Sequence, residues 1–427
     1  MGAPRPLHRA QVVLTAAAVS TAVAEDLDGF SAALRAGRSG VRVTGDEMAA
    51  EARTPVAAWP AEPDLTGWAA RRLAGDTEAA ARLVRAVSRT APPARGAARV
   101  AAAALHDAGL GPQERAAAGL IVAGNNLALA YQAEVWRGFI SRPGGVRPSH
   151  ALTHLDTDVI GAVSEATGVV GEGWQAGGAS AAGTLAVILA ARMIAAGDLD
   201  RCLVVAPVTE LSAAELRAFH ATGAMVSHAD PERPWQACRP FDRHRQGFVY
   251  GKGAAAVLLE EAGAAAARGA KPLALVAGYG QRLDGRRGTR PDPAGQVAAL
   301  RAALAAAGVD PGEVDYVNAH GTGSVVGDAV EAQALLSVFG AGPAPLINST
   351  KPLTGHCMGA SGLLELVATV LQMRDGFVHP NPNLAEPLDP ELPLAGRSAT
   401  PATIRTAVSN SVAFSGINCA LVLRSPG

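Results

Sequence analysis

The sequence predicts an α/β protein in which helices cover both faces of a largely parallel sheet. Short apolar runs typical of buried strands alternate with segments of helical periodicity along the chain. Parallel strands joined by helices produce this alternation. Aromatic residues make up 4% of the 427 residues while Ala and Gly abound, so we expect a core of small side chains at close backbone approach. With 49% hydrophobic residues, the chain is long enough for two core-forming halves.

The first half contains four predicted strands and two predicted helices. The apolar run 12–15 suits a buried strand, and a helix is expected over 27–36. A second buried strand covers 119–124 and ends in a turn. The apolar helix 185–196 ends at Gly197-Asp198 and is followed by strands over 201–206 and 254–260. The small-residue segment 263–271 is a plausible joint, so we divide the chain into 1–262 and 263–427.

The second half repeats this order without any repeat in the sequence itself, so a duplication is expected in the structure only. Strands are expected over 272–278, 314–318, 345–348, 404–411 and 418–424, the last two as a closing pair, and helices over 295–307, 326–339 and 358–373. The Gly-, Arg- and Pro-rich segment 284–293 and the five-proline segment 379–393 are predicted to be surface loops without chemistry of their own.

Charge and cysteine content exclude several classes of protein. The net charge is −1 and no basic run occurs, which argues against a nucleic-acid partner. The four cysteines, Cys202, Cys238, Cys357 and Cys419, lie far apart, so we expect buried reduced thiols and no metal site. The first nine residues have no apolar core and 185–196 is too short to span a bilayer. We therefore expect no signal peptide, no membrane association and a soluble cytoplasmic protein.

Three segments carry groups suited to acyl-thioester chemistry. Ser180 opens the apolar helix, His320 lies in Asn318-Ala319-His320-Gly321-Thr322-Gly323, and His356 ends the run 348–356. Two neutral imidazole N–H groups can stabilise a thioester oxyanion. A serine hydroxyl is a weaker acid than a thiol and needs a dedicated base. Ser180 has a second reading as a helix N-cap, a position that favours serine.

Further motifs occur in a fixed order, and together they resemble those of β-ketoacyl-carrier-protein synthases of the thiolase-like superfamily. They are Arg239-Pro240-Phe241-Asp242, Gly247-Phe248-Val249, Gly327-Asp328, Asn348-Ser349-Thr350-Lys351, Gly359-Ala360, Asn410-Ser411 and Phe414-Ser415-Gly416-Ile417-Asn418. The resemblance covers nearly the whole chain. It implies a five-layered αβαβα fold with two similar βαβ halves, and a homodimer. The histidines outside these motifs, His154, His220, His228 and His244, are predicted to be structural.

The resemblance places a serine where the family carries its nucleophilic cysteine. An alternative register would put Gln175 there, as in the related chain-length-factor subunits. Ser180 fits better because it heads a helix that runs without a gap to the Gly197-Asp198 turn, and because it precedes His320 by the family-like 140 residues.

Roles for the other site residues follow from the same resemblance. Lys351 would orient the site through Glu365, and Thr322 and Ser324 would hold the amides of a phosphopantetheine arm. Phe414 would supply an apolar wall, and the main-chain N–H groups of Ser180 and Phe414 would form a second oxyanion hole.

The sequence also departs from the family pattern. Ser415-Gly416-Ile417 replaces Gly-Gly-Thr, which predicts a less flexible loop. Gln246 and Lys252 stand where acidic residues are usual, so the local charge differs there.

The segment 171–180 and the residues around Leu211, Phe219 and Met225 resemble a subgroup of free-standing serine-for-cysteine proteins from polyketide β-branching cassettes. The resemblance implies a decarboxylase that converts malonyl-carrier protein into acetyl-carrier protein for a hydroxymethylglutaryl (HMG)-synthase-like partner. No cofactor is expected on the chain itself, because the carrier protein supplies the phosphopantetheine.

Two alternatives to the decarboxylase remain open. One is acyl transfer or condensation through an acyl-Ser180 intermediate, with His320 as the base. The other is a non-catalytic partner subunit that shapes another ketosynthase's tunnel or docks carriers.

Overall fold

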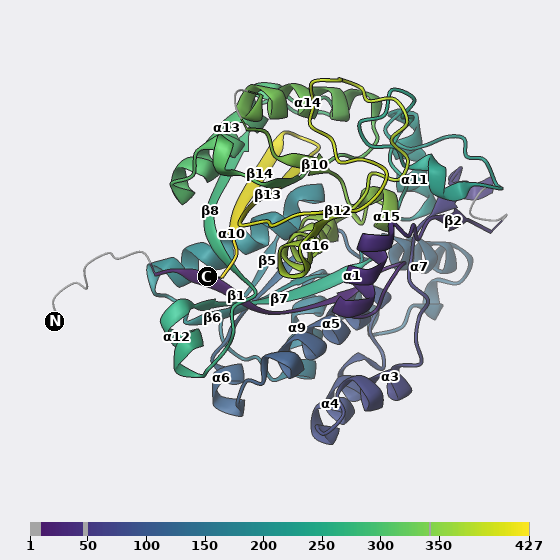
Figure 1. The fold of residues 1–427 in the computed structure, drawn as a ribbon. Helices are drawn as coiled ribbons and strands as arrows, with labels where there is room; N and C mark the ends of the chain where they lie inside the picture. Colours follow the sequence, from purple (N-terminus) through teal and green to yellow (C-terminus); the bar gives the residue numbers. More distant parts are fainter. Residues whose placement is uncertain (1–9, 46–49, 341–342, 427) are drawn as a thin grey trace.

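The computed structural model describes residues 10–45, 50–340 and 343–426 (Figure 1). The expectation that the first nine residues contain no signal peptide lies outside these ranges. The other elements expected from the sequence are present, several of them longer than expected.

The main sheet consists of two five-stranded halves with the same topology. Its order is β10-β9-β13-β14-β8-β1-β7-β6-β4-β5. In each half the strands lie in the order third, second, fourth, fifth, first along the chain. The halves join where Val12–Leu14 of β1 pairs with Ala274–Val276 of β8. The duplication expected in the structure is therefore a repeated strand order. The strands are β1 (Val12–Ser20), β4 (Gly119–Ala123), β5 (Gly173–Ala176), β6 (Arg201–Ala206), β7 (Ala254–Glu261), β8 (Ala274–Leu283), β9 (Tyr316–Asn318), β10 (Leu346–Asn348), β13 (Thr406–Ala413) and β14 (Ile417–Arg424).

The prediction of a largely parallel sheet is wrong. Parallel pairing is confined to β6-β4-β5 and β13-β9-β10, while β7 and β14 run antiparallel to both of their neighbours. β14 must run antiparallel to β13 because only a three-residue turn separates the two strands, and so short a connection joins only antiparallel strands. The sheet is mixed.

Helices complete five layers (Figure 1). α10 (Ala182–Ala196) and α16 (Ser361–Asp375) pack against each other between the two halves of the sheet, within one apolar cluster. α13 (Pro293–Ala307) and α14 (Val325–Phe339) cover one outer face, and α5 (Pro92–Ala108) and α9 (Thr157–Thr167) cover the other. This is the αβαβα architecture that the resemblance implied.

The central helices approach closely because small residues line their contact. A Cβ at Gly183 of α10 would lie 2.6 Å from the backbone nitrogen of Leu363 in α16. Only glycine fits at that distance. The expected core of small side chains at close backbone approach is thus confirmed at the centre of the fold.

The remaining elements are peripheral or short. No helix or strand is predicted from the sequence between residues 37 and 118, a segment in which the structure has several helices and short strands. The helices are α1 (Leu27–Ala36), α3 (Leu65–Arg72), α4 (Thr77–Val87), α6 (Pro112–Ala116), α7 (Leu129–Ser141), α8 (His150–Thr153), α11 (Ala213–Ala221), α12 (Ala262–Ala267) and α15 (Lys351–Thr354). Two small sheets consist of β2 (Arg42–Val43) with β3 (Val56–Ala57), and β11 (Phe377–Val378) with β12 (Thr400–Pro401).

Two local expectations need correction. The segment 379–393 is not simply a surface loop, because its start is buried: Asn381 donates to the Ala395 carbonyl at 3.1 Å, and Asn348 donates to the His379 carbonyl at 2.6 Å. The apolar helix is also longer than the predicted 185–196. With the preceding 3₁₀ turn it covers 179–196, long and apolar enough to span a membrane by length and composition alone. In this fold it is the central core helix, which accounts for its apolar sequence.

The expectation of buried reduced thiols is confirmed. Cys202, Cys238, Cys357 and Cys419 are all buried and unbonded.

Candidate active site

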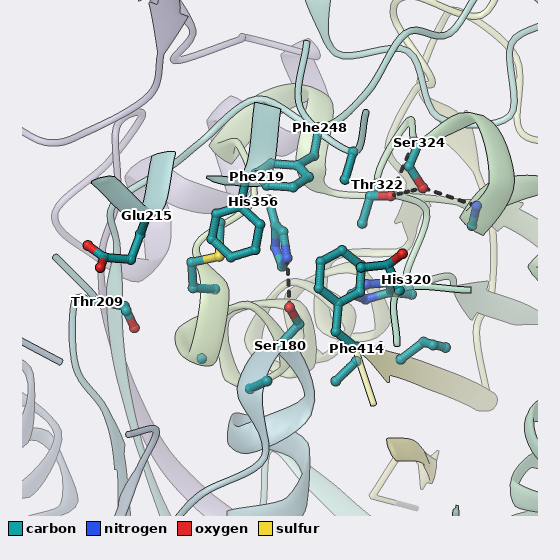
Figure 2. Close-up of a pocket in the computed structure, with 18 of the residues that line it drawn as sticks. Ser180, Thr209, Glu215, Phe219, Phe248, His320, Thr322, Ser324, His356 and Phe414 are labelled. Carbon is teal, nitrogen blue, oxygen red and sulfur yellow. Dashed lines mark hydrogen bonds between the residues drawn. The ribbon is translucent and has the colours of Figure 1, made fainter. Parts of the chain in front are cut away.

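A cavity of about 300 Å³ lies where the two halves of the protein meet. Ser180, His320, His356 and Phe414 line it together with the hydroxyl-bearing residues Thr322 and Ser324 (Figure 2). Residues that are up to 234 positions apart in the sequence, from Ser180 to Phe414, thus face one space. Lys351 and Glu365 are buried behind it.

Ser180 lies in a 3₁₀ turn, Ala179–Ala181, that leads into α10. Its Oγ is 2.9 Å from Nε2 of His356 (Figure 2). α10 has no side-chain cap, so the hydroxyl contacts the imidazole and does not act as a helix N-cap. Gln175 instead donates to the Gly124 carbonyl at 2.7 Å and is not among the residues that line the cavity. The structure therefore places Ser180, and not Gln175, against the histidine.

His356 is held by its backbone and by its ring. Its N–H donates to the Val249 carbonyl at 2.7 Å, and its carbonyl accepts from the Gly251 N–H at 3.0 Å. In the ring, Nδ1 lies 2.9 Å from Oγ of Ser361, the first residue of α16. The ring nitrogens thus contact one serine each. The expectation that His320 would be the base for Ser180 is wrong in its geometry, because His356 occupies that position.

His320 follows β9 and is positioned by a buried carboxylate. The N–H groups of His320 and Gly321 each donate to Glu331 at 2.7 Å, one to each carboxylate oxygen. Asn410 also donates to Glu331 at 2.7 Å. The His320 and His356 rings lie edge to face with centroids 5.6 Å apart.

Lys351 connects His320 to Glu365. Its Nζ donates to Glu365 Oε1 at 2.5 Å and to the His320 carbonyl, and it lies 3.4 Å from Nδ1 of the His320 ring. Both side chains of the ion pair are almost fully buried. This ammonium fixes the backbone of one histidine and adds a positive charge beside both.

The two imidazoles are neutral at pH 7. Burial, and then the charge of Lys351, holds the pKa of each well below the ordinary value of 6.5. Burial also raises the pKa of Glu331 and of Glu365, while Lys351 acts in the opposite direction on both. A neutral imidazole carries one N–H donor and one acceptor, so each ring can donate one hydrogen bond towards the cavity.

Thr322 and Ser324 form one end of the cavity, which we call the hydroxyl end. Thr322 Oγ1 donates to Ser324 Oγ at 3.0 Å, and Ser324 caps α14 by accepting from the Gly327 N–H at 3.2 Å. Asp328 accepts from the Thr322 and Gly323 N–H groups. The turn is therefore rigid, and both hydroxyls also line the cavity.

Three phenylalanines form an apolar wall beside the histidines. The Phe219 ring centroid lies 5.7 Å from that of Phe248 and 6.0 Å from that of Phe414, and Phe248 packs edge to face on His356 at 5.2 Å. Figure 2 shows Phe219 and Phe414 flanking the space above Ser180.

The loop 284–293 is largely exposed at the surface, as predicted, but part of it also lines the cavity. Gly288 to Pro291 line the cavity, and the Ser415 N–H donates to the Gly288 carbonyl at 2.8 Å. Asp284 ties the loop to the Phe414 turn, because its N–H donates to Gly416 at 2.9 Å and its carboxylate accepts from Asn418 at 2.7 Å.

The opposite end of the cavity is polar and is called the carboxylate end here. Glu215 and Thr209 line it (Figure 2). Glu215 is held by the start of α11, where it accepts from the Ser212 N–H at 3.0 Å. The cavity therefore has hydroxyls at one end, a carboxylate at the other, and Ser180 with the two imidazoles between them.

Two family models match the chain. The N-terminal domain of β-ketoacyl synthases covers residues 9–265 and the C-terminal domain covers residues 273–385. The chain belongs to the β-ketoacyl synthase family. Its thiolase-like fold is that of a ketosynthase.

Individual ketosynthase relatives differ in activity. The chain is 36% identical over 307 residues to the polyketide biosynthesis malonyl-ACP decarboxylase PksF of Bacillus subtilis (strain 168), covering 72% of this chain and 74% of that protein. It is 37% identical over 290 residues to 3-oxoacyl-[acyl-carrier-protein] synthase 2 of Staphylococcus aureus (strain COL), covering 66% and 68%. The solved ishigamide ketosynthase/chain length factor superposes with a TM-score of 0.86 at 28% identity, over 98% of this chain and all of that one.

Sequence reasoning missed several residues of this ketosynthase site. Glu331 carried a usable signal, since it forms with Asp328 a pair of acids about one turn apart in an otherwise uncharged helix. Ser361, Phe219 as part of the wall, and Glu215 gave no comparable signal, because their positions in the site depend on contacts with distant segments.

Proposed function

We propose that this ketosynthase-family protein decarboxylates a malonyl group carried as a thioester by an acyl carrier protein and leaves an acetyl group on the carrier. The observation that carries the proposal is the pair of neutral imidazoles, His320 and His356, that face one cavity beside a serine instead of a thiol. The similarity to PksF supports it.

The reaction needs only a few groups. The bond between the malonyl carboxylate and the methylene carbon breaks, CO2 leaves, and the electron pair moves to the thioester oxygen as an enolate. Imidazole N–H groups stabilise that oxygen, each typically by about 2.7–4 kcal/mol. A proton from water then reaches the carbon and completes the acetyl thioester. Without an acylated thiol in the site, the enolate meets no acyl electrophile.

The wall formed by the three phenylalanines favours the conversion of the charged malonyl carboxylate into neutral CO2. A carboxylate against Phe219, Phe248 and Phe414 is poorly solvated, whereas neutral CO2 is not penalised there. Phe414 lies in the turn between β13 and β14, so its ring closes the cavity from the C-terminal half.

We propose that the phosphopantetheine arm of the carrier enters past the hydroxyl end. Thr322 and Ser324 offer hydroxyls to its amides, and the main-chain N–H groups of Ser180 and Phe414 supply a second oxyanion hole. The arm belongs to the carrier protein, so the chain needs no cofactor of its own. The carboxylate end favours a short acyl group, because an alkyl chain gains nothing beside Glu215.

The acetyl product suits polyketide β-branching, in which an HMG-synthase-like protein would consume it. We place the protein in the cytoplasm as a homodimer. Its large exposed hydrophobic side chains concentrate between residues 136 and 174, where β5 forms an edge of the main sheet. They are Trp136, Phe139, Ile140, Val146, Leu152, Leu155, Val170 and Trp174.

One observation favours a second function. The 2.9 Å contact between Ser180 and His356 suits a serine that is acylated with an imidazole as base. A non-catalytic partner subunit is a third reading, because the structural neighbour's name includes a chain length factor. The buried Lys351–Glu365 pair behind the histidines argues against it, since a scaffold has no need of it.

Mass spectrometry of a malonyl-loaded carrier protein incubated with the chain separates the three readings. We expect loss of CO2 from the carrier with the wild type and with Ser180→Ala, and a 10²–10³-fold slower loss with His320→Ala. A stable acyl adduct on Ser180 would favour acyl transfer. An unchanged carrier without an adduct would favour the partner subunit, which would then co-purify as an obligate heterodimer.

A further inference from the structure

The His356 ring lies between two serines whose surroundings differ. Nε2 contacts Ser180, which lines the open cavity, and Nδ1 contacts Ser361, which is 3% exposed. Both contacts are 2.9 Å. Because the ring is neutral, only one of its nitrogens carries a proton. The direction of the hydrogen bond between Nδ1 and Ser361 determines which nitrogen that is.

The burial of Ser361 decides the direction of that contact. A hydroxyl has one proton to donate and two lone pairs. Among the described residues, His356 Nδ1 is the one hydrogen-bond partner of the Ser361 hydroxyl. If Nδ1–H were the donor, the Ser361 proton would be buried without an acceptor, which is costly. If Ser361 donates, only lone pairs are left unused, which native structures tolerate more readily.

We infer that the Ser361 hydroxyl donates to Nδ1 of His356 and thereby places the ring proton on Nε2. Ser361 is then a positioning residue, because it acts through His356 and does not line the cavity itself. Nε2–H then donates to Ser180 Oγ, and the Ser180 proton points into the cavity.

This tautomer has two chemical consequences. Nε2–H is the donor that a thioester oxygen requires, so the ring is prepared for oxyanion stabilisation. Nε2 has no free lone pair with which to take the Ser180 proton, so the serine is left without a base despite the short contact. The role of this tautomer in catalysis rests on the proposed decarboxylation, whereas the assignment of the ring proton to Nε2 does not depend on it.

The test combines three readouts on four proteins: wild type, Ser361→Ala, Ser361→Thr and Thr369→Val. Nitrogen-15 NMR of histidine-labelled protein reports the tautomer, with the His356 signals assigned by their absence in His356→Gln. A fluorophosphonate probe followed by intact mass reports the reactivity of Ser180. Malonyl-carrier decarboxylation gives kcat and KM. Thr369→Val is the matched control, because it removes another buried hydroxyl from α16, one whose only hydrogen-bond partner in the described part of the chain is the Glu365 carbonyl, at 2.8 Å.

We expect the wild type to show Nε2–H and slow labelling of Ser180. In Ser361→Ala we expect a mixture of the two His356 tautomers and labelling of Ser180 by the probe that is about tenfold faster. We also expect kcat to fall about tenfold with little change in KM, which corresponds to the loss of one ordinary hydrogen bond. Ser361→Thr should behave as the wild type, and Thr369→Val should change neither the tautomer nor the labelling.

Two results would overturn the inference. One is an Nδ1–H signal in the wild type. The other is a change in tautomer or labelling that is the same in Thr369→Val as in Ser361→Ala. A wild type that leaves malonyl carrier intact would instead sink the proposed function, and the NMR signal would still decide the tautomer.

Discussion

Lys351 and Glu365 form an ion pair at 2.5 Å, with side chains that are only 1% and 3% exposed. The same ammonium donates to the His320 carbonyl. A buried pair of this kind fixes geometry, and removing one partner leaves the other without a counter-charge.

We expect Lys351→Met to lower the free energy of unfolding by about 3–5 kcal/mol, because Glu365 is left buried and unpaired. Urea denaturation measures this loss. The double variant Lys351→Met/Glu365→Gln should recover much of it. Equal losses in the single and double variants would show that the ion pair is not the cause.

The low pKa of both histidines predicts a flat pH profile for decarboxylation. Burial and Lys351 keep the rings of His320 and His356 neutral below pH 6.5, so the rate should show no inflection there. The sign for stability follows from the same shifts. Below pH 6.5 the two histidines bind protons in the unfolded chain but not in the folded protein. The stability that the neutral histidines contribute is therefore fully present above pH 6.5 and is lost as the pH falls.

Rate measurements on the malonyl carrier from pH 8 to pH 5.5 check this profile. The Lys351→Met/Glu365→Gln variant is the comparison, since loss of the positive charge should move any inflection upward towards 6.5. A wild-type inflection at 6.5 would contradict the buried, neutral state of the two rings.

The left-handed backbone conformation of Ser415 leads us to predict a stabilising substitution at this position. It adopts a φ of 66° in the turn between β13 and β14, a left-handed conformation that costs a serine free energy and a glycine little. We expect Ser415→Gly to raise the free energy of unfolding by about 0.5–1 kcal/mol, measured by urea denaturation. The adjacent Gly416→Ala, at a φ of 76° and with Asp284 2.6 Å from the added Cβ, should do the opposite. A loss of stability in Ser415→Gly would show that the turn is not strained.

The carboxylate end predicts a limit on acyl chain length. Glu215→Ala should tighten binding of octanoyl-pantetheine about tenfold, measured by calorimetry, and leave acetyl-pantetheine unchanged, because only the longer chain reaches the carboxylate. Glu215→Gln removes the charge but retains an acceptor for the Ser212 N–H, so it separates charge from helix capping. Equal affinity for octanoyl-pantetheine in the wild type and in both Glu215 variants would show that the end of the acyl chain does not lie beside Glu215.

The exposed hydrophobic segment predicts a dimer that charges disrupt. Trp174 on the edge strand β5 is 53% exposed and Ile140 on α7 is 79% exposed. Trp174→Arg with Ile140→Glu should convert the dimer into a monomer in sedimentation velocity, since charges are unfavourable at the core of an interface. Trp235→Arg, at an exposed tryptophan far along the chain, is the control. If the wild type itself sediments as a monomer, the proposal that the protein is a homodimer is wrong.

The sequence by itself determined the local elements and the chemical groups of the site. Helix 27–36 and strand 201–206 were predicted with the bounds that the structure has, because hydrophobic periodicity and a terminal glycine are local signals. Ser180, His320, His356 and Lys351 were found because they lie in short, ordered motifs.

Only the tertiary structure decided strand direction and the connections within the site. β7 and β14 run antiparallel to their neighbours, a relation that depends on how distant segments pair. Ser361 and Glu215 became site residues, and His356 rather than His320 became the neighbour of Ser180, for the same reason. Periodicity reports which face of an element is buried, but the partner of that face comes from elsewhere in the chain and is chosen only when the whole core packs.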